Sequence, residues 1–161
     1  MPLKTEPDER GFQEFLAEFE PRIAALGLAA VEHLRRLLPS ADVMIYDNYN
    51  FLVAGFSPND RPSDAVLSIA MSARGVNLCF LFGAALPDPH GILRGGGNRV
   101  RNIRLASVED FERPEVEMLI DLAIAGGPVA FDATRQGRFP SRRCLLARLA
   151  AGALPGSGSR L

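Results

Sequence analysis

The segment from Arg94 to Arg104 joins three consecutive glycines to four arginines, and these residue types could hold an anion. Glycine backbone can approach a ligand closely, and each guanidinium group is a charge-assisted donor that suits phosphate or carboxylate. The segment has neither the Gly-Lys-Ser/Thr of a P-loop nor the surroundings of a dinucleotide-binding fingerprint. Two interpretations stay open: a loop that binds a small anion, with Arg94 and Asn98 as ligands, or a plain connection into an edge strand.

Arg101 is the arginine of this segment with the most specific predicted position. It has the same strand parity as Ile103 and Leu105, so its side chain should point toward the covered side of the sheet. It could line the mouth of a ligand pocket. It could equally be an inward-pointing edge charge that discourages aggregation.

Tyr46 and Tyr49 are the two tyrosines of the chain, and polar residues cluster with them between two apolar runs. A ligand-binding turn would use the two phenol groups. The alternative is a turn rich in Asp and Asn, whose side chains satisfy the local backbone.

The N-terminal part of the chain is acidic, with 5 Lys or Arg against 10 Asp or Glu in residues 1–60. Glu14 and Glu18 are four residues apart and share a helix face, with Glu20 close by. Carboxylate oxygens suit hard cations, which makes these three residues weak candidates for a metal site. An ordinary solvated helix face has the same charge density.

Enzyme motifs are not recognisable in this sequence. It has no Gly-x-Ser-x-Gly, and His33 and His90 are expected on a helix surface and in a loop. Cys79 and Cys144 lack a second ligand at zinc spacing. We therefore favour a non-enzymatic protein with no resident cofactor. A catalytic triad whose residues are far apart in the sequence would not be visible as a motif.

The charge of the chain does not favour nucleic-acid binding. The isoelectric point is near 6.1, and Phe139 is the single aromatic residue among the arginines of the C-terminal part. Proteins that bind single strands combine a positive groove with several stacking aromatics. A small molecule or a protein partner fits better, with the chain as a monomer or a homodimer.

The residue periodicity predicts the elements that must position these side chains. Apolar residues, among them Phe12, Phe15 and Phe19, recur at helical spacing from residue 9 to 38. The period changes to two from Ala41. A last helix is expected at residues 114–125, with a start signal at Ser107 before it and Pro114 in its first turn. The predicted fold is α+β, an antiparallel sheet of about 4–5 strands packed against N-terminal and C-terminal helices.

Length and composition predict one packed domain. The chain has 161 residues, of which 47% are apolar, and the N-terminus has no apolar run of the kind that directs secretion, so we expect a cytoplasmic protein. Periodicity weakens after Pro128. We therefore expect a domain at 1–127 and a basic, partly disordered tail at 128–161, in which Leu145, Leu146 and Leu149 could form a short helix.

Several motifs occur in an order that resembles the YdhG-like domain family, over about residues 12 to 125. They are FL at 15–16, PRIAAL at 21–26, LPSA at 38–41, MIYDNYN at 44–50, GFSP at 55–58, LPDPHG at 86–91, LRGGGN at 93–98 and RNIRL at 101–105. The resemblance implies an α-β sandwich. One branch of that family is frataxin-like in fold and treated as an iron chaperone, so the resemblance also implies iron binding as an alternative function. It supplies no catalytic residues to carry over.

Overall fold

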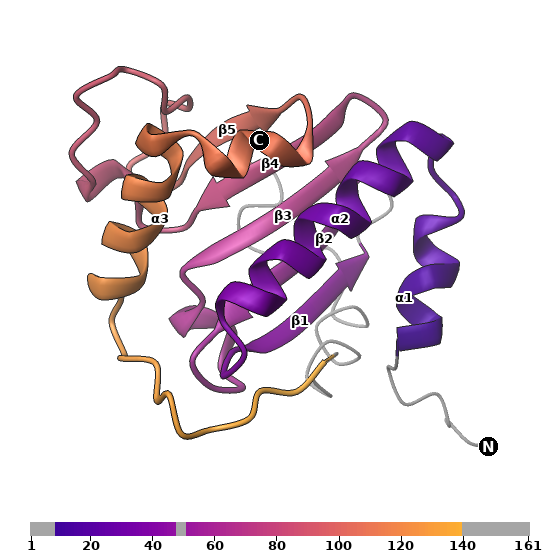
Figure 1. Ribbon diagram of the computed structural model, residues 1–161, viewed down its shortest axis with the longest axis horizontal. Helices are drawn as coiled ribbons and strands as arrows, with labels where there is room; N and C mark the ends of the chain where they lie inside the picture. Colours follow the sequence, from indigo (N-terminus) through magenta and orange to yellow (C-terminus); the bar gives the residue numbers. More distant parts are fainter. Residues whose placement is uncertain (1–8, 48–50, 140–161) are drawn as a thin grey trace.

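A five-stranded antiparallel sheet forms the centre of the molecule, as a computed structural model that describes residues 9–47 and 51–139 reveals (Figure 1). The strands follow one another in chain order, β1-β2-β3-β4-β5, and each is antiparallel to its neighbours. In this described part of the chain, three α-helices accompany the sheet, two before it and one after it. The predicted α+β fold with N-terminal and C-terminal helices is therefore confirmed. The bounds of the elements are α1 Glu9–Leu16, α2 Pro21–Leu37, β1 Asp42–Asp47, β2 Leu52–Ser57, β3 Leu67–Ser72, β4 Gly75–Phe80, β5 Arg101–Leu105 and α3 Pro114–Ala125.

Helix α2 crosses the sheet and packs on its central strands (Figure 1). Pro21 is well suited to the first turn, because that turn leaves its backbone N–H groups without partners inside the helix. Gly27 allows the close approach, since a Cβ atom at this position would collide with the Met71 sulfur. Arg35 and Arg36 in the last turn offset the partial negative charge at the helix end.

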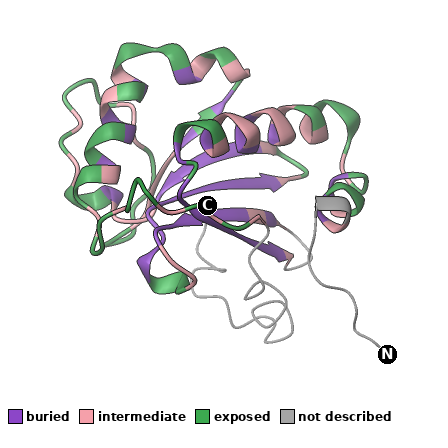
Figure 2. Cartoon of the chain, turned by 60° about the horizontal axis from the view of Figure 1, so that its bottom comes forward, coloured by how far each residue is buried: buried purple, intermediate pink, exposed green. Residues whose placement is uncertain are grey.

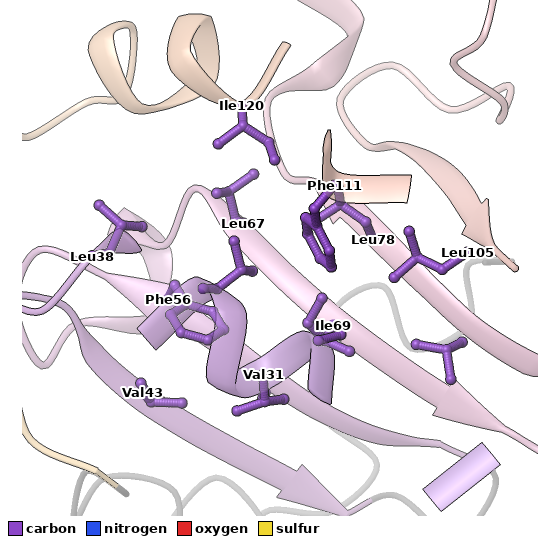
Figure 3. Packing of buried hydrophobic residues seen from close by; sticks show 14 of the residues in the cluster. Val31, Leu38, Val43, Phe56, Leu67, Ile69, Leu78, Leu105, Phe111 and Ile120 are labelled. Atoms are coloured by element: carbon purple, nitrogen blue, oxygen red, sulfur yellow. The ribbon is translucent and has the colours of Figure 1, made fainter. Parts of the chain in front are cut away.

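The apolar core lies between the helices and one face of the sheet (Figure 3). Alternate strand residues such as Phe56, Ile69 and Leu78 point to this face, as the period of two predicted. They meet Val31 of α2 and Ile120 of α3. Each large apolar side chain buried in this way contributes about 1.5–3 kcal/mol. Of the three phenylalanines expected in the core, Phe12 is fully buried, and Phe15 and Phe19 pack against the cluster partly buried.

The opposite face of the sheet carries smaller and more polar residues, which are also buried (Figure 2). Met44, Ser68, Ala70, Asn77 and Cys79 belong to it by strand parity and stay outside the apolar cluster of the helix side. All three helices pack on the face that carries the apolar cluster. The residues of the opposite face are buried as well, so both faces of the sheet are shielded from solvent.

Helix α3 spans the expected residues, and the start signal at Ser107 belongs to a separate short helix before it. The Asp110 carboxylate accepts hydrogen bonds from the backbone N–H groups of Ala106 and Ser107, at 2.7 and 3.3 Å. That cap starts a 3₁₀ helix, Val108–Glu112, and the α-helix starts only at Pro114. Phe111 of the 3₁₀ helix is buried in the core.

The chain beyond α3 returns to β1 and runs along its start. The Val43 N–H donates to the Arg138 carbonyl at 2.9 Å, and the Gly137 N–H donates to the Pro39 carbonyl at 3.0 Å. The Phe139 ring meets the Phe12 ring edge to face, with 5.6 Å between centroids. Residues 135–139 thus pack on the domain. The boundary after residue 127 stays a prediction, and residues 140–161 lie outside the described residues.

No helix within residues 9–47 and 51–139 is long and apolar enough to cross a membrane.

Candidate anion-binding cleft

A cleft of about 280 Å³ opens where the end of α2, the start of β1 and residues 136–139 meet. Its walls come from segments about a hundred residues apart in the chain. The polar and aromatic residues that line it are Glu32, Arg35, Arg36, Gln136, Arg138 and Phe139. Ligand sites commonly occupy about 300–1,000 Å³, so a cleft of this size suits a small ligand.

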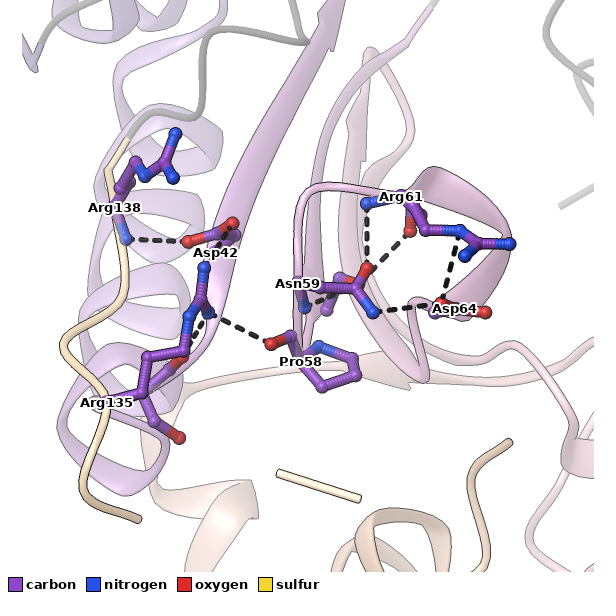
Figure 4. A network of polar contacts seen from close by, with 9 residues as sticks. Asp42, Pro58, Asn59, Arg61, Asp64, Arg135 and Arg138 are labelled. Carbon is purple, nitrogen blue, oxygen red and sulfur yellow. Dashed lines mark hydrogen bonds and ion pairs between the residues drawn. The ribbon is translucent and has the colours of Figure 1, made fainter. Parts of the chain in front are cut away.

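Asp42 and Arg135 hold one wall of the cleft in place (Figure 4). The Asp42 side chain is completely buried, and its carboxylate accepts from Arg135 Nη2 and from the Arg138 N–H, both at 2.9 Å. Arg135 Nη1 also donates to the carbonyl oxygens of Ser40 and Pro58, at 3.0 and 2.9 Å. A buried carboxylate needs such partners, because an unpaired one would be expensive. The segment is thereby fixed against β1 without regular secondary structure.

The turn before Arg135 is closed by Asp132. Its Oδ1 atom accepts from the Thr134 N–H at 2.9 Å and from the Thr134 hydroxyl at 2.7 Å. These hydrogen bonds lower the pKa of the Asp132 carboxyl, because they favour its charged form. The turn closed by the ionised Asp132 carboxylate directly precedes Arg135, which pairs with Asp42.

The cleft presents more positive than negative side chains. The Arg35 guanidinium lies over the Phe139 ring, 3.8 Å from its centroid, which is cation–π geometry. Arg36 and Arg138 are exposed, and within residues 9–47 and 51–139 their guanidinium groups form no ion pair or hydrogen bond. Glu32 is the one carboxylate among the lining residues. Because Asp42 is already paired with Arg135, the donors of Arg36 and Arg138 are available to an anion.

The glycine-rich segment predicted as a site is organised by contacts within itself. Arg101 Nη1 donates to the carbonyl oxygens of Gly97 and Val100. Arg94 pairs through its backbone with Asn102, at 2.8 and 2.9 Å, and so covers the outer edge of β5. Arg94 and Asn98 lie exposed in the segment that leads into β5, and Arg101 is the first residue of that strand. Their role as ligands stays a prediction.

Tyr46, which was also predicted as a ligand, lies apart from the glycine-rich segment. Tyr46 belongs to β1, at the edge of the sheet opposite to β5, and its hydroxyl group donates to the Met44 sulfur at 3.5 Å. Tyr46 therefore does not join Arg94 and Arg101 in one site. Tyr49 lies outside the described residues.

The weak metal candidates are solvent-exposed carboxylates. Glu14 lies on α1, Glu18 lies in the turn that follows this helix, and Glu20 is the N-cap residue of α2. The prediction that Glu14 and Glu18 share a helix face is wrong, because α1 ends at Leu16. Among the residues that the structure describes, no three His, Cys, Asp or Glu side chains are placed to hold a metal ion together.

Two further titratable groups have shifted pKa values for reasons of packing. The His33 ring stacks on Phe111 with 4.3 Å between centroids, and burial, then the nearby Arg36 charge, lower its pKa. Burial raises the pKa of the Cys79 thiol to about 12, so this thiol stays protonated at neutral pH. Neither group has the surroundings of an activated base or nucleophile.

Some residues of the cleft can be picked out in the sequence. Arg135 and Arg138 stand out as cations of the basic tail, but nothing in their spacing pairs them with Asp42, which lies more than ninety residues away. Asp42 is the first residue of a strand of apolar alternation, where a carboxylate is unusual. That position is the signal that would have singled it out.

Comparisons with protein-family models, with curated proteins and with solved structures found no match for this chain.

Proposed function

We propose that this protein is a non-enzymatic binding module that holds a small anionic ligand in the cleft between α2 and residues 136–139. The observation that carries the proposal is the pair of guanidinium groups, Arg36 and Arg138, which face one cleft from two segments and lack partners in the described part of the chain. Guanidinium groups bind carboxylate and phosphate in bidentate fashion. Phe139 and Arg35 add a flat surface beside them.

The ligand class follows from size and charge. A cleft of about 280 Å³ is small for a nucleotide and suits a di- or tricarboxylate or a compact phosphate ester. A cytoplasmic location is part of this proposal. Membership of the YdhG-like family is part of the same proposal, but it does not indicate which ligand the protein binds. The iron-chaperone alternative has less support, since Glu14, Glu18 and Glu20 are solvated carboxylates.

The test is thermal unfolding with inorganic phosphate, sulfate and citrate as probes, against sodium chloride of equal ionic strength. A probe at about 100 times its Kd stabilises the folded state by roughly 2.7 kcal/mol, which corresponds to a rise in Tm of about 5–11 °C in a domain of this size. The variant Arg36→Gln with Arg138→Gln should lose that rise.

The matched control is Arg94→Gln with Arg99→Gln, which removes the same charge from the glycine-rich loop. It should keep the full response of the wild-type protein. A response lost only in this control would move the site to the loop that the sequence indicated. No response to any probe in the wild-type protein would sink the proposal.

A further inference from the structure

Glu32 is the one carboxylate among the residues that line the cleft. It lies on α2, half-buried, one helical turn before Arg36. A glutamate and an arginine at this spacing commonly form an ion pair on a helix surface. Here the Glu32 carboxylate forms no ion pair or hydrogen bond with any residue of 9–47 and 51–139. The cleft therefore offers a negative group as well as the guanidinium groups of Arg36 and Arg138.

The charge of Glu32 distinguishes between two kinds of anionic ligand. A ligand that carries negative charge alone would bring a like charge close to Glu32, and salt screens such repulsion less in a cleft than on an open surface. A ligand that also carries a protonated amine would instead donate a charge-assisted hydrogen bond to this carboxylate. The same residue thus opposes the first kind of ligand and favours the second.

The end of α2 offers further acceptors to an amine. This helix ends at Leu37, and the last carbonyl groups of a helix carry partial negative charge. Within residues 9–47 and 51–139, the carbonyl oxygens of Arg36 and Leu37 accept no backbone hydrogen bond, and Pro39 after them has no N–H to donate. An ammonium group has three N–H donors, so it suits a group of acceptors better than a single one.

We propose that the ligand of this cleft is zwitterionic, with an anionic group bound by Arg36 and Arg138 and a protonated amine bound by Glu32. This inference rests on the proposed function, because it specifies the ligand of the same site. Acidic amino acids and amine-bearing phosphate monoesters share this chemistry. Both are small enough for a cleft of about 280 Å³.

Pairs of probes that differ in the amine test the inference in the wild-type protein. The pairs are glutamate with glutarate, aspartate with succinate, and phosphoethanolamine with ethyl phosphate, each titrated by calorimetry at neutral pH and equal ionic strength. The amine-free member has the greater negative charge, so a cleft that recognised negative charge alone would bind it more tightly. We expect the amine-bearing member of at least one pair to have a Kd about tenfold lower, as a hydrogen bond between charged groups allows. The pair with the largest ratio identifies the anionic group as carboxylate or phosphate.

Glu32→Gln tests the residue that the inference names, because it keeps the size of the side chain and removes its charge. This variant should lose the preference for the amine and bind the amine-free probe more tightly than the wild-type protein does. The matched control is Asp121→Asn, which removes one negative charge from the exposed surface of α3, outside the cleft. It should keep the wild-type preference.

Two results would overturn the inference and leave the anion site in place. One is a wild-type protein that binds the amine-free member of every pair as tightly as its partner, or more tightly. The other is a preference for the amine that persists in Glu32→Gln. Failure of the proposed function has a different signature, since then no probe of either kind would bind, and both proposals would fall together.

Discussion

The ion pair between Arg135 and Asp42 predicts a large loss of stability in Arg135→Gln. The Asp42 side chain is completely buried and the Arg135 side chain is 27% exposed. Breaking a fully buried pair costs about 3–5 kcal/mol, because the remaining charge is left without compensation. Solvent reaches Arg135, and the Arg138 N–H still donates to Asp42, so we expect a smaller value of about 2–3 kcal/mol.

The assay is equilibrium unfolding in urea at neutral pH, followed by circular dichroism. The matched control is Arg113→Gln, since Arg113 pairs with Glu115 at 2.7 Å while both side chains remain open to solvent. That variant should lower the free energy of unfolding far less than Arg135→Gln does, because solvent screens the pair. The shorter of the two ion pairs is therefore the one expected to matter less, and a ranking by distance alone would predict the opposite.

A double-mutant cycle with Asp42→Asn isolates the pair. The two single variants remove partners of one interaction, so the double variant should cost about 1–3 kcal/mol less than the sum of the single costs. Additive costs, or a loss below about 1 kcal/mol in Arg135→Gln, would show that residues 135–139 are not held by this contact. The wall of the proposed cleft would then need another explanation.

Three further predictions concern separate parts of the fold. The pKa of His33 is lowered in the folded state, so the unfolded chain binds a proton at this histidine at a higher pH than the folded chain does. The free energy of unfolding should therefore fall as the pH drops below about 6.5. His33→Gln should flatten that slope in urea titrations. Gly27→Val should destabilise by about 1–3 kcal/mol through overpacking against Met71, which a lower urea midpoint would reveal. Arg101→Gln should cost about 0.5–1.5 kcal/mol by releasing the carbonyls of its own loop, with no change in the response to anions.

Each of these has an outcome that contradicts it. A pH slope unchanged in His33→Gln would assign the effect to other groups. A Gly27→Val protein as stable as the wild type would mean that α2 can move away from the sheet. If Arg101→Gln loses the rise in Tm that anions cause, the binding site would lie at the glycine-rich loop instead of the cleft.

The helices and strands could be predicted from the sequence because apolar residues recur in them at a regular spacing. The alternation in residues 67–72 and 75–80 placed two strands, and Pro21 and Pro114 marked the first turns of α2 and α3. The start signal at Ser107 was genuine, but it caps a 3₁₀ helix rather than α3.

The cleft could not be read in the same way. Residues 128–139 have no periodicity, and their position depends on one carboxylate and one guanidinium that are 93 residues apart in the chain. Parity indicated the side of the sheet for Arg101. It could not indicate that the guanidinium group turns back to the Gly97 and Val100 carbonyls, because that depends on the path of the loop.

The contact between Asp42 and Arg135 also sets an order for events on the ribosome. The five strands pair with their neighbours in chain order, so the sheet can assemble while the chain is still being made. Arg135 is synthesised 93 residues after Asp42, a delay on the order of 5 to 20 s. Until then Asp42 has no Arg135 to pair with and the cleft lacks one wall. A nascent or prematurely terminated chain therefore has the sheet but not the cleft, and anion binding would distinguish finished molecules from unfinished ones.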